Sequence, residues 1–217
     1  GSTGVGFGLQ NDIMASYLVH MTNDEQKQRW LPGFVSGELI TAVAMSEPGA
    51  GSDLASIKTT AVRDGDDYII NGAKYCSPSG VRGGFVVTAA RTGGPGAAGV
   101  SLIVVDKGTP GFEVSRKLEK MGWRSSDTAE LSYTDVRVPV ANLIGPENSG
   151  FLQIAAAFVS ERVGLAAQAY SSAQRCLVLT VEWCRNRDTF GRPLISRQSV
   201  QNTLAEMARK VDVARVY

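Results

Sequence analysis

The feature that most restricts the fold is a double change of residue pattern along the chain. Residues 1–36 read as helical. Residues 37–148 are rich in Val, Ile, Thr and Tyr, with a turn signal about every ten residues, which indicates a compact antiparallel sheet or barrel. Residues 149–217 turn helical again. The sequence therefore predicts an α+β fold with a helical N-terminal segment, an antiparallel β-barrel middle domain and the start of a C-terminal helical bundle.

Local signals place elements inside these zones. Asn23 is a suitable cap for a short helix, Asp24 to Leu31, which Pro32 and Gly33 are expected to end. Residues 67–70 form a predicted strand, and the Asn71-Gly72 pair after it is typical of a type I′-like turn. Further buried strands are predicted at residues 40–45, 85–89 and 100–105.

Composition excludes several classes of protein. The chain has 217 residues and a net charge of +1 with both signs well mixed, so we expect no nucleic-acid partner. Its three cysteines have no metal-ligand spacing and are odd in number, which predicts a reducing compartment and no metal site. No stretch reads as long and apolar enough to span a bilayer, and no secretory leader opens the chain, so we expect no membrane partner.

The segment from Met45 to Asp53 is the strongest candidate for a binding loop. It follows the predicted strand at residues 40–45, breaks at Pro48 and continues with small residues before Ser52 and Asp53. Glycines let a bound group approach the backbone, and exposed N–H groups with a serine hydroxyl suit a phosphate or a flavin ring edge. A plain connector after a strand is the alternative.

Glu161 is the strongest candidate for a general base. Between Ser149 and Gln174 the only charged side chains are Glu161 and Arg162. Glu161 shares a helical stripe with apolar residues at spacings of three and four, namely Phe151, Ile154, Phe158 and Leu165. A carboxylate on that stripe is expected to face the bundle interior, where desolvation raises its pKa towards the working pH. The alternative is a structural carboxylate paired with a group on another helix.

Several motifs in chain order resemble those of the acyl-CoA dehydrogenase family. The resemblance covers essentially the whole chain, and it implies that further family helices precede residue 1 and follow residue 217. The motifs are Asp24-Glu25-Gln26-Lys27-Gln28-Arg29-Trp30-Leu31-Pro32, Met45 to Asp53, Tyr68-Ile69-Ile70-Asn71-Gly72-Ala73-Lys74, Lys120-Met121-Gly122-Trp123-Arg124-Ser125-Ser126-Asp127-Thr128, Asp135-Val136-Arg137-Val138-Pro139 and Arg187-Asp188-Thr189-Phe190-Gly191.

The resemblance implies an FAD-dependent α,β-dehydrogenation of an acyl-CoA thioester. Glu161 would take the α proton while the β hydride passes to N5 of FAD, as isovaleryl-CoA dehydrogenase and similar members place their glutamate here. Other members place it much later, in a region that this chain lacks, so a base beyond residue 217 stays open. Arg162 is implied to brace the thioester and pantetheine end, and Ser52 and Ser160 are further implied substrate contacts.

Two groups of residues are implied to bind FAD. The first comprises Met45, Ser46, Gly51, Ser52, Cys76, Ser77 and Pro78, and the second comprises Arg187, Thr189, Phe190 and Gln198. In the family the second group reaches the flavin phosphates of a neighbouring subunit, which implies a homotetramer or a dimer of dimers. Read without the resemblance, Arg187 is a solvated arginine at a helix end.

One motif departs from the family pattern. After Lys74 and an aromatic residue the family has Trp-Ile-Thr-Asn-Gly, whereas this chain has Cys76-Ser77-Pro78-Ser79-Gly80. Proline offers neither a hydroxyl nor an N–H, so the flavin contact of the threonine is lost or supplied by Ser77 or Ser79. No histidine lies near Cys76 in sequence, and His20 is expected on the surface, so a Cys/His nucleophile is not predicted.

The implied electron acceptor is an electron-transfer flavoprotein, and the implied location is the cytoplasm of a bacterium or the mitochondrial matrix of a eukaryote. Two alternatives share the fold: a flavin oxidase or monooxygenase, and a non-catalytic partner subunit, which Pro78 favours and the Glu161-Arg162 pair opposes. A nicotinamide enzyme is disfavoured because no Gly-x-Gly-x-x-Gly motif follows a strand.

Overall fold

The structure is a computed structural model that describes residues 4–217, so the first three residues of the predicted helical segment lie outside the described part. The chain forms two compact units, Gly1–Glu161 and Arg162–Tyr217. Each unit has its own internal packing.

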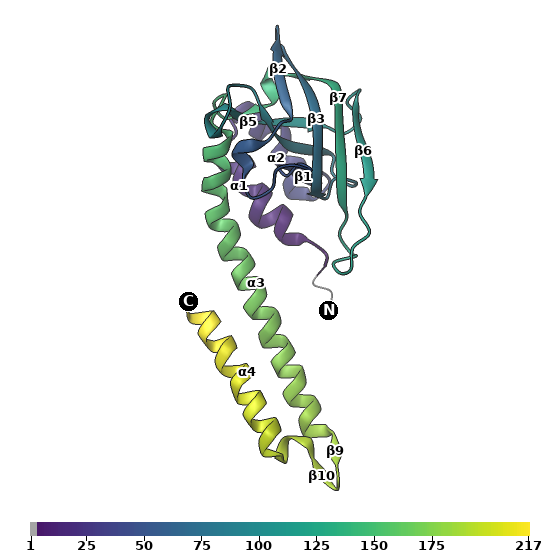
Figure 1. The fold of residues 1–217 in the computed structure, drawn as a ribbon, viewed down its shortest axis with the longest axis vertical. Helices are drawn as coiled ribbons and strands as arrows, with labels where there is room; N and C mark the ends of the chain where they lie inside the picture. The colour runs from purple at the N-terminus through teal and green to yellow at the C-terminus, as the bar shows by residue number, and fades with distance from the viewer. Residues whose placement is uncertain (1–3) are drawn as a thin grey trace. The chain divides into compact units, whose positions relative to one another are not determined.

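The N-terminal segment is helical, as the sequence predicts. It contains a π-helix, η1 (Leu9–Met14), followed by α1 (Ala15–His20) and α2 (Asp24–Ser36) (Figure 1). Asn23 caps α2 in a reciprocal arrangement, because its side chain accepts from the Gln26 N–H at 2.8 Å and its own N–H donates to the Gln26 side chain at 3.1 Å. The Gln26 amide also donates to the carbonyls of Ala141 and Leu143, which ties α2 to the sheet.

The predicted end of α2 at Pro32 is wrong, because the helix runs through this proline to Ser36. Proline removes one helical N–H, and the carbonyl that loses its partner belongs to Gln28, on the water-exposed side of α2. Trp30 is buried and Phe34 packs against the same core, so helical continuation gains apolar contacts. The helix ends instead at Gly37, whose φ of 80° lies in the left-handed region.

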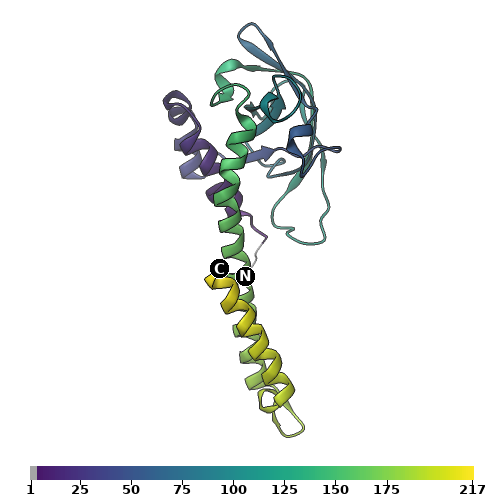
Figure 2. The same cartoon turned by 60° about the vertical axis from the view of Figure 1, so that its left-hand side comes forward.

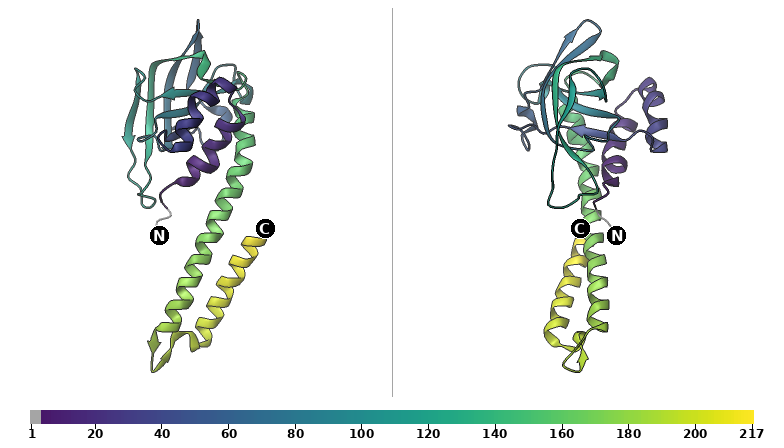
Figure 3. Two further views of the ribbon diagram at one scale, coloured as in Figure 1. Left: turned by 180° about the vertical axis from the view of Figure 1, so that it is seen from behind. Right: turned by 90° about the vertical axis from the view of Figure 1, so that its right-hand side faces the viewer.

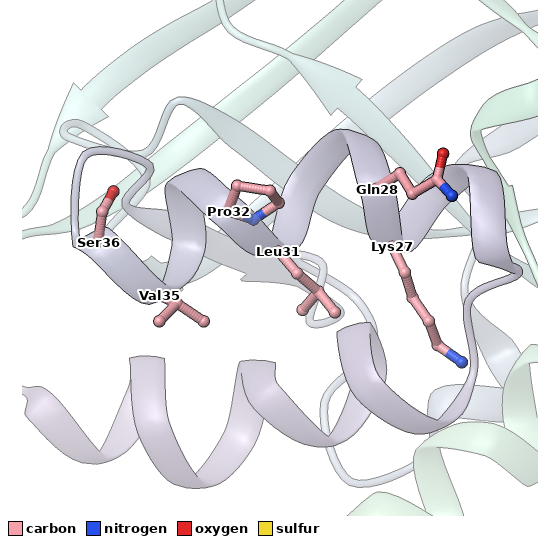
Figure 4. Close-up of a pocket in the computed structure, with 6 residues that line it drawn as sticks. All are labelled: Lys27, Gln28, Leu31, Pro32, Val35 and Ser36. Carbon is pink, nitrogen blue, oxygen red and sulfur yellow. The ribbon is translucent and has the colours of Figure 1, made fainter.

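The outer face of α2 carries a surface hollow lined by α2 residues alone, namely Lys27, Gln28, Leu31, Pro32, Val35 and Ser36 (Figure 4). Lys27, Leu31 and Val35 lie at successive spacings of four and share one side of the helix. None of the predicted site residues lines this hollow.

Among residues 4–217, eight strands form one sheet in the order β6-β7-β3-β2-β4-β5-β8, with β1 beside β4. Strand β1 is parallel to β4 in the register Thr41↔Phe85, whereas most other pairs are antiparallel. The predicted α+β fold is confirmed, and its sheet is mixed rather than wholly antiparallel. The strands are β1 (Thr41–Ala44), β2 (Thr60–Asp64), β3 (Asp67–Pro78), β4 (Phe85–Arg91), β5 (Val100–Asp106), β6 (Phe112–Lys117), β7 (Thr128–Pro139) and β8 (Leu143–Ile144).

The central strands are buried on both faces. In β4, Phe85 and Val87 belong to one core cluster, while Val86 belongs to the other. The first cluster includes the helical segment and the beginning of α3, and the second is enclosed by the sheet itself, which curls around it (Figure 2). Burial on both faces explains why residues 85–90 and 100–105 read as mainly apolar runs, each with a single buried hydroxyl residue, Thr88 or Ser101, and no polar alternation.

The predicted turn at Asn71-Gly72 is wrong. Strand β3 continues through this pair to Pro78, with a bulge between Ile70 and Gly72 in its pairing with β7. Gly72 has a φ of 150°, and a Cβ added there would lie 2.4 Å from the Thr59 hydroxyl. The glycine is therefore required by a close backbone approach, and the hairpin turn lies earlier, at Gly65, whose φ is 65°.

The second unit is a helical hairpin that begins within α3, at Arg162. Helix α3 (Gly150–Asn186) is followed by a small ribbon of β9 (Asp188–Thr189) and β10 (Arg192–Pro193) and then by α4 (Gln198–Val216). Figure 3 shows the end of α3 and α4 running in opposite directions from this ribbon.

The expectation that no segment could span a bilayer is wrong for α3. Within the described residues, this helix alone has the length and apolar composition to cross a membrane. This finding rests on length and composition alone. A helix in the interior of a helical bundle has the same length and apolar composition.

Candidate active site

The loop after β1 closes on itself in a tight turn. The Glu47 N–H donates to the Ala50 carbonyl at 2.7 Å, and the Ala50 N–H donates to the Glu47 carbonyl at 3.1 Å, with Pro48 and Gly49 between them. Gly51 and Ser52 then lie exposed, and within the described chain their amide N–H groups donate to no protein acceptor. The predicted binding loop is thus a pinned turn followed by two free amide donors.

The buried side of this loop is held by an ion pair that the sequence analysis missed. The Lys74 ammonium, from β3, donates to Glu47 Oε1 and to the Met45 carbonyl, each at 2.9 Å. Burial lowers the pKa of Lys74 to about 8, although the Glu47 charge acts in the opposite direction. Burial raises the pKa of Glu47, but hydrogen bonds from Thr59 and Lys58 and the charge of Lys74 outweigh it, so this pKa lies below its usual value.

The structure brings the loop and one edge of β3 together. The Tyr75 N–H donates to the Ser46 carbonyl at 2.8 Å, which places Met45 and Ser46 beside Cys76. A hollow of about 490 Å³ lies on this edge, between Pro48 of the loop and residues of β3, β6 and β7. The loop and β3 therefore form one continuous surface.

A second irregularity in β3 decides which groups reach that surface. The pairing of β3 with β7 shifts between Lys74 and Ser77, and Cys76, at a φ of 56°, lies exposed at the shift. The Ser77 hydroxyl is enclosed and has no hydrogen-bond partner among the described residues. A ligand along the exposed edge would therefore meet Cys76 and Pro78 rather than the Ser77 hydroxyl. Ser79 is also buried, and its N–H donates to the Asp127 carbonyl at 3.1 Å.

Glu161 lies on α3 one turn beyond Ala157 and Phe158, which pack into the first core cluster. Its side chain is half-buried, and its charge reaches the hydroxyl of Tyr17 on α1. That hydroxyl is buried without a hydrogen-bond partner among the described residues, and its pKa is raised by burial first and by Glu161 second. Glu161 is thus close enough to act on the charge state of Tyr17, a tyrosine that carried no sequence signal.

The other residues of the predicted stripe divide into two sets. Phe151, Ile154 and Phe158 pack in the core, whereas Leu165 is 50% exposed. Ser160 is exposed, and its hydroxyl donates to the Ala157 carbonyl at 3.0 Å. Arg162 is exposed as well, so its guanidinium and the Ser160 hydroxyl lie at the surface of the described chain.

The second predicted FAD group lies on the ribbon of the second unit. Phe190 is 98% exposed at the tip, with a φ of 51°. Arg197, which the sequence analysis missed, donates to the Thr189 carbonyl at 2.5 Å and to its hydroxyl at 2.9 Å, and its guanidinium lies 5.3 Å from the Phe190 ring centre. Arg187 and Gln198 are exposed at the two ends of this ribbon. Arg197 thus orders the turn and leaves the Arg187 guanidinium available for an anion.

The residues present fit an FAD. A Cβ added at Gly49 or Gly51 would meet no atom within 4 Å, so the space in front of the loop is open. The free amides of Gly51 and Ser52 and the exposed guanidinium of Arg187 suit a flavin edge and a phosphate. At Pro78 the donor set is poorer than the family pattern.

Comparison with known proteins identifies the family to which the chain belongs. Sequence models of the acyl-CoA dehydrogenase N-terminal, middle and C-terminal domains match residues 1–38, 42–136 and 148–217. The chain is 38% identical to the long-chain specific acyl-CoA dehydrogenase of Sus scrofa mitochondria, over 99% of this chain and 51% of that protein. It is 36% identical to the isovaleryl-CoA dehydrogenase of Pongo abelii mitochondria, over 100% of this chain and 52% of that protein. The chain spans about half the length of the curated relatives it matches.

Solved structures agree. The acyl-CoA dehydrogenase of Geobacillus kaustophilus superposes with a TM-score of 0.95 at 45% identity, over 99% of this chain and 57% of that one. A chain from the structure described as the electron transferring flavoprotein of Acidaminococcus fermentans superposes with a TM-score of 0.93 at 36% identity, over 98% of this chain and 57% of that one. With three domain models of one family matched in order and curated relatives along the whole chain, this protein belongs to the acyl-CoA dehydrogenase family of flavoprotein oxidoreductases.

Proposed function

We propose that this chain belongs to an FAD-dependent enzyme that removes the α and β hydrogens of an acyl-CoA thioester. The observation that carries the proposal is the half-buried Glu161 on α3, beside the core cluster and near enough to the buried Tyr17 to help raise the pKa of its hydroxyl. FAD, when bound, supplies the acceptor for the β hydride, which no side chain can accept.

Glu161 is the proposed base. Its carboxylate would take the proton from the α carbon of the thioester, whose carbonyl acidifies that position. Ala157 and Phe158, one turn before it on α3, pack in the apolar core, and partial burial beside them would favour proton transfer from carbon over solvation of the carboxylate by water. Arg162, with Ser52 and Ser160, is proposed to hold the thioester and pantetheine end.

The FAD would be held by two groups. Met45, Ser46, Gly51 and Ser52 form the loop side, with Cys76, Ser77 and Pro78 along β3. We propose that Arg187, Thr189, Phe190 and Gln198 act on the cofactor of a neighbouring subunit in a homotetramer or dimer of dimers. Electrons would leave to an electron-transfer flavoprotein, in the cytoplasm of a bacterium or in the mitochondrial matrix of a eukaryote.

Pro78 favours a second candidate, a non-catalytic subunit that binds an active homologue. The family threonine at this position is replaced by a residue without a hydroxyl or N–H, and the neighbouring Ser77 hydroxyl is enclosed. A flavin site weakened in this way can survive as a binding surface after the reaction is lost.

The full-length protein tests these candidates. We expect a yellow holoprotein whose flavin bleaches under anaerobic conditions when acyl-CoA thioesters of different chain lengths are added. Glu161→Gln should retain FAD and lose bleaching by about a thousandfold or more, since a positioned general base contributes factors of this order. Glu182→Gln, an exposed glutamate on the same helix, is the matched control and should bleach normally.

Each contrary outcome is informative. Bleaching retained in Glu161→Gln would reject Glu161 as the base and point to a residue beyond this chain. A colourless wild-type protein that co-purifies with an active homologue would support the non-catalytic subunit. Rapid reoxidation of the reduced flavin by oxygen, and none by an electron-transfer flavoprotein, would indicate an oxidase.

A further inference from the structure

The ion pair between Lys74 and Glu47, beneath the loop after β1, is almost completely buried. The Lys74 side chain is 0% exposed and the Glu47 side chain 7% exposed, and the two groups are 2.9 Å apart. Transferring both charges from water costs several kcal/mol per ion, and a well-packed apolar pair is often as stable as a buried ion pair. A contribution to global stability is therefore a weak explanation for two buried charges here. A stronger explanation is that the pair holds the loop in one position.

Both acceptors of the Lys74 ammonium belong to the loop. They are the Met45 carbonyl and Glu47 Oε1, and Lys74 itself lies within β3, so these bonds hold the loop against that strand. One residue further along β3, the Tyr75 N–H donates to the Ser46 carbonyl at 2.8 Å. Three consecutive loop residues are thus fixed to two consecutive residues of β3.

Glu47 extends the same network to the chain that enters β2. Its Oε2 accepts from the Lys58 N–H at 2.6 Å, and its Oε1 accepts from the Thr59 N–H at 2.9 Å. Because Glu47 also closes the turn with Ala50, one carboxylate sets the position of the turn relative to both β2 and β3. The exposed residues Gly51 and Ser52 follow this turn directly, so the turn also sets their position.

We propose that Lys74 and Glu47 are positioning residues for the flavin: the buried pair fixes the loop so that the amides of Gly51 and Ser52 and the backbone of Met45 and Ser46 meet the cofactor together. This inference rests on the proposed FAD binding and assigns its geometry to two side chains that do not touch the cofactor. A preformed loop lowers the ordering cost of binding, so the pair contributes to FAD affinity through loop order.

The test uses the full-length protein, freed of FAD and titrated with FAD while flavin fluorescence is followed. We expect Lys74→Met to raise the dissociation constant of FAD by about tenfold or more. At saturating FAD, the band shape and circular dichroism of the bound flavin near 450 nm should also change, which a purely structural role would not produce. Lys58→Met is the matched control, because this exposed lysine contacts Glu47 through its backbone only and should bind FAD normally.

Glu47→Gln and the double variant complete the design. Glu47→Gln keeps an acceptor for the backbone amides and should weaken FAD binding in the same direction. The double variant should bind FAD no more weakly than Lys74→Met, because the two side chains act as one unit.

Wild-type FAD affinity and flavin spectrum in both single variants, with only a lower unfolding temperature of the FAD-free protein, would overturn the inference. Strictly additive losses in the double variant would also count against a paired role. A wild-type protein that binds no FAD would instead refute the proposed function itself.

Discussion

The Lys74 ammonium is a charge held where water cannot solvate it. Burial lowers its pKa to about 8, while in the unfolded chain a lysine titrates near 10.5. Between these values the unfolded chain binds a proton that the folded chain has released. The free energy of unfolding contributed by this group therefore rises with pH across that window. Raising the pH disfavours the state that binds the proton, and here that state is the unfolded chain.

The direction of this pH dependence can be measured with a single substitution at Lys74. We expect the difference in free energy of unfolding between the wild type and Lys74→Met to shift in favour of the wild type between pH 7.5 and pH 10, by at most about 1.4 kcal/mol per pH unit. Chemical denaturation of the FAD-free proteins at several pH values measures it. The buried tyrosines titrate in both proteins and cancel in the difference. Parallel pH profiles would mean that Lys74 is solvated in the folded state.

Strand β3 shows how one element serves two roles. Its first half pairs with β2 and buries Tyr68 and Ile70, and its second half carries Lys74 and the exposed edge at Cys76. Two shifts in its pairing with β7 separate these parts. Bulges re-aim side chains along a strand, so each shift changes which residues face the core and which face the loop.

The first bulge predicts a strong substitution effect. Gly72→Ala would place a Cβ 2.4 Å from the Thr59 hydroxyl and 2.7 Å from its Cα, at a φ of 150°. We expect a loss of about 2–4 kcal/mol in the free energy of unfolding, since overpacking and backbone strain combine. Gly122→Ala is the control, because its Cβ would meet nothing within 4 Å. Equal effects in the two variants, measured by urea denaturation, would show that the β3 backbone relaxes freely.

At the scale of the whole molecule, the residues proposed to bind FAD belong to two separate units. The loop and β3 lie in Gly1–Glu161, and the Arg187–Gln198 ribbon lies in Arg162–Tyr217. If the ribbon serves a neighbouring subunit, each flavin site is built from two chains, and cofactor binding depends on assembly.

Subunit complementation tests this sharing. Ser46→Trp should block the loop side and Arg187→Glu the phosphate side, so neither variant alone is expected to retain FAD. Mixed oligomers from co-expression should recover part of the wild-type FAD content, because a normal loop of one chain then meets a normal ribbon of the other. FAD content per subunit after tandem-tag purification measures it. Co-expression of Ser46→Trp with Ser52→Trp is the control and should recover nothing; recovery there, or none in the mixed pair, would refute a shared site.

The order of helical, strand and helical zones was readable from the sequence because residue periodicity is a local property. The Asn23 cap and the strands at residues 85–89 and 100–105 follow from a capping residue and from short apolar runs, and the structure contains each of them. Local signals misled where packing outweighed them: Pro32 lies inside α2, and Asn71-Gly72 forms a bulge rather than a turn.

Only the tertiary structure determined which side chains of the candidate site interact with one another. Lys74 meets Glu47 across 27 residues, and the charge of Glu161 reaches Tyr17 from a helix more than 140 residues away. No local pattern encodes such pairs, because they depend on how strands align and on which faces become buried. The sequence determined the elements and the kinds of chemical group that this family member carries. The folded chain determined which of those groups lose water together, and desolvation is what couples one charge to another.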